Sequence, residues 1–130
     1  MQIALRSARL HPPVSIKDGG LWVDSFEDLV ASKMVALVEH GAPRDFRDIH
    51  ALCTAELIAP AHCWQLWRQR QNLAGSDANP DRAKLAVETH LTRISLHRPL
   101  EKIVAIQQRD EAEKTRNWFA DVFLQALRYV

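Results

Sequence analysis

The chain is short of cysteine, of glycine and of long apolar runs, and each shortage excludes a class of protein. Its 130 residues include only two cysteines, Cys53 and Cys63, which are too few for a disulfide framework. We therefore expect free thiols and a reducing, cytoplasmic location. No run approaches the roughly 20 apolar residues of a membrane-spanning helix, and residues 1–10 lack the pattern of a signal peptide. The four glycines form no loop of the kind that cradles phosphate groups.

An excess of charge of either sign is also missing. The chain has 17 lysines and arginines against 16 aspartates and glutamates, which gives a net charge of +1. This balance gives no support for a nucleic-acid partner and none for a cationic one. Apolar residues make up 47% of the sequence, which is enough to bury a core in a chain of single-domain length.

Turn-forming residues divide the chain into a short first part and a long helical part. Residues 1–24 hold two short apolar stretches, at 2–7 and 20–24, which predict two short strands separated by His11-Pro-Pro13 and Asp18-Gly-Gly20. Beyond them, caps, prolines and apolar spacing predict helices over about 25–41, 43–55, 60–74, 80–97, 100–107 and 110–130. The expected fold class is mainly α, a helical bundle with a short N-terminal β element.

Two charged residues stand where the helical spacing predicts apolar ones. Lys33 lies between Leu29 and Leu37 in an apolar stripe that also contains Phe26 and Val30. Asp45 projects close to the apolar face of the next helix, and a tight turn joins the two helices, so the two side chains could meet. One interpretation is a buried ion pair that fixes the angle between the helices. The other is a lysine that points into a cleft and meets a phosphate, while the aspartate orients it or holds a metal.

The order of residues around this pair resembles a known family. The stretch VDSFEDLVASKMVAL at 23–37, followed by PRDFRDI at 43–49, resembles the C-terminal signature of AbiEii-type nucleotidyltransferase toxins. In that family a short strand leads into a helix that reads roughly S-x-x-x-L-x-x-x-K-x-x-A-L, and R-D-x-x-D-[IL] follows after a short turn. The family belongs to the polymerase-β-like nucleotidyltransferases and includes toxins of type IV toxin–antitoxin systems and abortive-infection proteins. The resemblance covers residues 20–55.

The resemblance implies roles for three residues. Lys33 matches the motif lysine, which is expected to contact nucleotide phosphates. Asp45 matches the aspartate that shares the active site with this lysine, and Asp48 matches a second, supporting acidic position. His40 departs from the pattern, because many members have an arginine near this point. Complete members transfer a nucleotide from a nucleoside triphosphate, with Mg²⁺, to RNA or protein acceptors.

The chain departs further from the family pattern upstream of Lys33. The family's metal site needs a Gly-Ser motif and an Asp-x-Asp pair on adjacent strands, and neither motif occurs before Lys33. We therefore expect residues 1–24 to be the end of a nucleotidyltransferase-like core and residues 25–130 to be its C-terminal helical domain. The resulting hypothesis is a truncated or degenerate family member, inactive alone, with no metal ligands and no cofactor on this chain by itself.

The alternative hypothesis is a non-catalytic helical interaction module. Such a module would use an unpaired strand edge and the last helix for dimerisation or for binding a partner of a toxin–antitoxin system. The partners that either hypothesis allows are a second copy of the chain, a cognate antitoxin, and a half encoded upstream that supplies the missing strands.

Other patterns favour packing over chemistry. The histidines and cysteines between residues 50 and 63 can bind metals, but the adjacent His62 and Cys63 point in different directions on a helix, so we expect no zinc site. Trp64 and Trp67 could stack on nucleic-acid bases, although their i, i+3 spacing favours a core. Core packing is also expected for a stripe on the last helix, formed by Phe119, Val122, Phe123, Ala126 and Val130.

Overall fold

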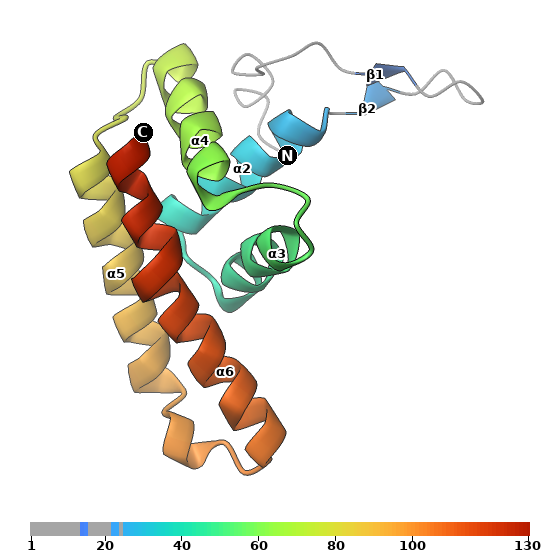
Figure 1. Cartoon of the computed structure of the whole chain (residues 1–130). Coiled ribbons are helices and arrows are strands. Elements are labelled where there is room, and N and C mark those ends of the chain that lie inside the picture. Colours follow the sequence, from blue (N-terminus) through green and yellow to red (C-terminus); the bar gives the residue numbers. More distant parts are fainter. Residues whose placement is uncertain (1–13, 16–21, 24) are drawn as a thin grey trace.

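A computed structural model of the chain describes residues 14–15, 22–23 and 25–130. Strands β1 (Val14–Ser15) and β2 (Trp22–Val23) pair antiparallel. Strand β2 falls within the stretch predicted at 20–24, whereas the strand predicted at 2–7 lies outside the described residues. All further elements of the described chain are helices (Figure 1), so the prediction of a mainly α fold is confirmed.

Five α-helices follow the strands in the described chain: α2 (Phe26–Glu39), α3 (Pro43–Thr54), α4 (Pro60–Ala74), α5 (Pro80–His97) and α6 (Ile106–Trp118). Shorter helical segments complete the chain, namely a 3₁₀ turn (Leu100–Lys102), a π turn (Phe119–Phe123) and a 3₁₀ helix (Leu124–Tyr129). In Figure 1, α5 and the α6 segment run side by side as a long antiparallel pair, and α2, α3 and α4 pack together beside its upper part. None of these described helices has the length and apolar character that crossing a membrane requires.

Capping residues set most of the helix boundaries. Pro43, Pro60 and Pro80 each stand at the start of a helix, where the missing N–H of proline is not needed. Ser25 caps α2, because its Oγ accepts a hydrogen bond from the backbone N of Asp28 at 3.2 Å. The predicted boundaries of α2 to α5 are therefore confirmed to within two residues, whereas the predicted helix at 100–107 is only a 3₁₀ turn.

The core lies where α2, α4 and the C-terminal segment meet. Trp64 and Trp67 are 0% and 2% exposed, which confirms them as core residues and excludes base stacking by their rings. The Nε1 of Trp64 donates a hydrogen bond to the backbone O of Phe123 at 2.9 Å, so the polar edge of this buried ring has a partner. Helix α5 also contributes to the core, through the buried Ala83 and Val87 and the partly buried Leu91 and Ile94.

The buried positions of the C-terminal segment differ from the predicted stripe. Phe119 and Phe123 are buried as expected, but Val122 is 46% exposed, and the core side continues through Leu124 and Leu127. The π turn at Phe119–Phe123 has more residues per turn than an α-helix, and the 3₁₀ helix after it has fewer. The 3.6-residue spacing used for the prediction does not hold across this change, so the assignment of Val122 to the core is wrong.

A buried ion pair, which the sequence analysis did not predict, joins α2 to α4. The Nη2 of Arg70 donates hydrogen bonds to the Oδ1 and to the backbone O of Asp28, each at 3.2 Å. The Nη1 of Arg70 donates to Ser32 Oγ at 3.1 Å, and Ser25 Oγ donates to the other carboxylate oxygen of Asp28 at 2.9 Å. The two charged side chains are 3% and 0% exposed, so this network fixes α4 against α2 from inside the protein.

Candidate functional site

Lys33 lies on the flank of α2 and not in its core-facing stripe. Phe26 and Leu29, which the sequence analysis placed in that stripe, are each 44% exposed. Helix α4 approaches α2 on another side, where Arg70 contacts it. This contact turns a different set of residues toward the core: Val30, Ala31, Met34 and Leu37. The expectation that Lys33 interrupts a buried stripe is therefore wrong, and its side chain is 31% exposed.

Lys33 forms its ion pair with Asp48 and not with Asp45. The Nζ of Lys33 donates a hydrogen bond to Asp48 Oδ2 at 3.0 Å, and the Asp48 side chain is 49% exposed. Asp45 instead accepts a hydrogen bond on Oδ2 from the backbone N of Ala42 at 3.0 Å, so it closes the first turn of α3. The interpretation of a buried Lys33–Asp45 pair is thus wrong, because Asp45 is held at the start of its own helix.

Helix α5 holds the turn that sets the angle between α2 and α3. Gly41, at the end of α2, has a φ of +59° and donates a hydrogen bond to Ala36 O at 3.1 Å. His90 Nε2 lies 2.9 Å from the backbone O of Val38, and Arg93 Nη2 donates to the backbone O of His40 at 2.8 Å. Two side chains of α5 therefore fasten the carbonyl end of α2, and this positions Lys33 relative to α3.

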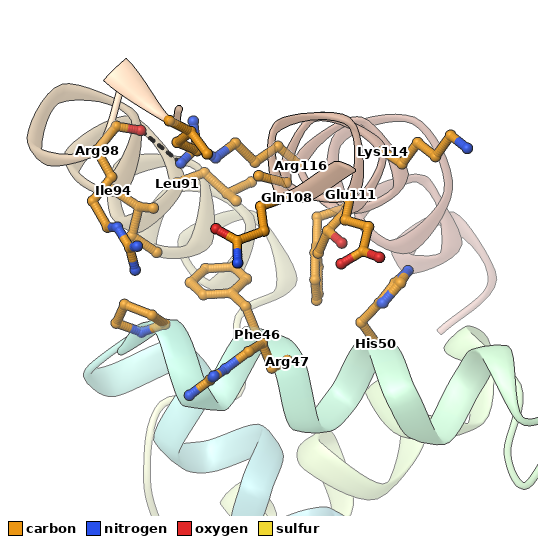
Figure 2. A pocket seen from close by; sticks show the side chains of 15 residues that line it. Phe46, Arg47, His50, Leu91, Ile94, Arg98, Gln108, Glu111, Lys114 and Arg116 are labelled. Carbon is orange, nitrogen blue, oxygen red and sulfur yellow. Dashed lines mark hydrogen bonds between the residues drawn. The ribbon is translucent and has the colours of Figure 1, made fainter. Parts of the chain in front are cut away.

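A groove of about 670 Å³ lies on the other side of α3, between α3, α5 and α6 (Figure 2). Phe46 and His50, one turn apart on α3, line it, whereas Asp48 projects from the opposite side of this helix. Phe46 packs edge to face on Phe119 with ring centroids 4.9 Å apart. Partial burial lowers the pKa of His50 from its ordinary value, which favours the neutral form of this histidine. This groove was not predicted from the sequence, because its α3 wall lies more than 40 residues along the chain from its α5 and α6 walls.

The carboxylates near Lys33 do not form a site that fits Mg²⁺. Magnesium prefers oxygen ligands in a near-ideal octahedron. One oxygen of Asp45 is bonded to the start of α3, and one oxygen of Asp48 is bonded to Lys33. Across the part of the chain that the structure describes, no three His, Cys, Asp or Glu side chains come together in a group that could hold a metal ion.

Comparison with known protein families assigns the chain to a family. Residues 5–122 match the family described as nucleotidyl transferase AbiEii toxin, type IV TA system. The chain belongs to the AbiEii family. The match extends well beyond residues 20–55, on which the sequence resemblance was based. Searches of curated proteins and of solved structures returned no significant match.

The first prediction concerns the contribution of the Lys33–Asp48 ion pair to stability. Replacing Lys33 or Asp48 with alanine is expected to change the free energy of unfolding by less than about 1 kcal/mol, because water screens a pair this exposed. Urea unfolding of both single variants and of the double variant gives the coupling energy directly. A coupling of several kcal/mol would contradict the exposed geometry. A small coupling energy means that Lys33→Ala can be used in functional tests without loss of stability.

Proposed function

We propose that this chain supplies the phosphate-contacting helices of an AbiEii nucleotidyltransferase site and is inactive without a metal-binding half. The observation that carries the proposal is the ion pair between Lys33 and Asp48, at an exposed junction of α2 and α3. The sequence around Lys33 and Asp48 resembles the motif of the AbiEii family, and the chain belongs to that family by its match over residues 5–122. The pair places an ammonium group at the protein surface, where a triphosphate can reach it.

Each of the three motif residues has a separate part in this proposal. Lys33 contacts phosphate oxygens of the nucleoside triphosphate as a compact positive charge. Asp48 orients the ammonium group from 3.0 Å until the more highly charged triphosphate engages it. Asp45 is a positioning residue, because its bond to the backbone of Ala42 fixes the start of the helix that carries Asp48. The nucleotide would be transferred to an acceptor with release of pyrophosphate, and Mg²⁺ for that reaction would be held by carboxylates outside this chain.

The second prediction tests inactivity of the isolated chain. Calorimetric titration with each ribonucleoside triphosphate in the presence of Mg²⁺ is expected to show no saturable binding, because the described carboxylates form no metal site. A single lysine charge in water gives only weak attraction for a phosphate. Micromolar or tighter binding by the chain alone would contradict the claim that a metal-binding half is required.

The third prediction tests the role of Lys33 once the missing half is supplied. The chain would be co-expressed with a segment carrying Gly-Ser and Asp-x-Asp from a complete family member, and transfer of labelled nucleotide would be measured. Lys33→Ala is expected to reduce transfer about 100-fold, as for other groups that stabilise charge in a transition state. Lys114→Ala, on the exposed surface of α6, is the matched control and is expected to leave transfer unchanged. Equal rates for both variants would contradict the role of Lys33.

A second candidate function is that of an interaction module. Phe26 and Leu29 are each 44% exposed on α2, and Leu29 lies one turn before Lys33. Exposed large apolar residues that lie close together are typical of interaction surfaces. The partners to test are a second copy of the chain and the antitoxin that the family suggests. Light scattering on the purified chain distinguishes the two partners. If the chain is a homodimer, Phe26→Glu is expected to dissociate it. If the chain is a monomer that gains mass only when the antitoxin is added, the antitoxin is the partner.

A further inference from the structure

The only two cysteines of the chain lie in contact across two helices. Cys53 stands at the penultimate position of α3, and Cys63 lies in the first turn of α4. Their Sγ atoms are 3.9 Å apart. Both thiols are free, Cys53 is half-buried, and Cys63 is fully buried. Neither the family match nor the proposed nucleotide site gives this pair a role.

We propose that Cys53 and Cys63 form a thiol oxidation site that takes hydrogen peroxide and closes to an intramolecular disulfide. In the first step the Cys53 thiolate attacks one peroxide oxygen, an S–O bond forms, the O–O bond breaks and hydroxide leaves. In the second step the Cys63 sulfur attacks the sulfur of the Cys53 sulfenic acid, an S–S bond forms, and the hydroxyl leaves as water with the proton of Cys63. The two thiols together lose two electrons and two protons, and one peroxide becomes two waters.

The environments of the two thiols assign them different parts in this reaction. Cys53 can be reached from solvent, and its hydrogen bond with the Cys63 thiol lowers its pKa. The same contact, followed by burial, raises the pKa of Cys63, which is 0% exposed. Reaction with peroxide requires an accessible thiolate. Cys53 is therefore the residue that is oxidised first, and Cys63 is the residue that resolves the sulfenic acid.

The local backbone allows the two sulfurs to approach each other. A disulfide bond is about 2.05 Å long, so the sulfurs must close by slightly less than 2 Å from their distance of 3.9 Å. Cys53 is one residue from the end of α3 and is only half-buried, so its side chain is not enclosed on all sides. Glu56, between the two cysteines, has a φ of +59°, so the chain already reverses direction in a tight turn that brings both helix ends together.

The test is to treat the folded chain with hydrogen peroxide and to map the thiols by mass spectrometry. Trypsin places both cysteines in one peptide, residues 48–68, because it cleaves after Arg47 and Arg68. Cleavage after Glu56 then separates the two cysteines, so the halves stay together only if a disulfide joins them. We expect this peptide to lose the mass of two hydrogens, to stay joined after that cleavage, and to separate on reduction.

Serine variants assign the order of the two steps. Cys63→Ser is expected to stop at a Cys53 sulfenic acid that dimedone traps, whereas Cys53→Ser is expected to react with peroxide at least ten times more slowly. Thermal unfolding of both variants checks that each is folded, and the mapping of the unmodified chain does not depend on them. A product cross-linked only between two chains, independent oxidation of both thiols to sulfinic acids, or no loss of thiol would each overturn the proposal.

Discussion

Replacing Asp28 with alanine is expected to lower the free energy of unfolding by about 3 to 5 kcal/mol, because the charge of Arg70 would stay buried without its carboxylate. The two side chains are 0% and 3% exposed, so water cannot take the place of the lost partner. Ser32 Oγ and the backbone O of residue 28 would still accept hydrogen bonds, but neither carries a full negative charge. Urea unfolding followed by tryptophan fluorescence measures the loss, since Trp64 and Trp67 are in the core.

Two further variants test this interpretation of the Asp28–Arg70 pair. Glu27→Ala removes a neighbouring carboxylate whose contact with His62 is 3.0 Å long and half-exposed, so it is expected to cost less than about 1 kcal/mol. The double variant Asp28→Leu, Arg70→Met replaces the charges with apolar groups and is expected to recover most of the loss, as for other buried pairs. If Asp28→Ala unfolds like the unmodified chain, the pair is not buried in solution.

The helix boundaries could be predicted from the sequence because they depend on residues close together in the chain. Proline at the start of α3, α4 and α5 and the Ser25 cap of α2 act within one turn of helix. The exception is α6, where no side-chain cap marks the start at Ile106 and a π turn changes the spacing after Trp118. Apolar periodicity assumes a constant number of residues per turn, so it placed Val122 on the wrong side.

The contacts between helices could not be predicted in the same way. Which aspartate of α3 meets Lys33 depends on the crossing of α2 and α3, and α5 fixes that crossing through His90 and Arg93, about 50 residues away. The pair of Asp28 and Arg70 spans 42 residues, and helical spacing within α2 gives Asp28 only the position of a first-turn acid. The roles of Lys33, Asp45 and Asp48 rest on the family motif and stay predictions, which the nucleotide experiments test.

Replacing Gly41 with alanine is expected to lower the free energy of unfolding by about 2 to 5 kcal/mol, for two additive reasons. With a φ of +59°, the position is left-handed, which costs a residue with a Cβ about 1 to 2 kcal/mol. A Cβ at this position would also overlap the His90 ring, and displacing a packed side chain costs about 1 to 3 kcal/mol. The ring cannot move freely, because its Nε2 lies 2.9 Å from Val38 O.

Gly75 provides a matched control that separates the two reasons. It also ends a helix with a positive φ, +67°, but a Cβ there would meet nothing within 4 Å. Gly75→Ala is therefore expected to lower the free energy of unfolding by only about 1 to 2 kcal/mol, the cost of the left-handed backbone. Equal losses of stability at Gly41 and Gly75 would contradict a clash with His90. His90→Gly in the Gly41→Ala background removes both the ring and the Cβ that the new Cβ would overlap, so the double variant is expected to lose less than the sum of its parts. The Gly41 turn and His90 together set the angle between α2 and α3. Gly41→Ala and the double variant can therefore also be assayed for nucleotide transfer with a supplied metal-binding half. A change in transfer would show that the reaction depends on the placement of Lys33 beside Asp48.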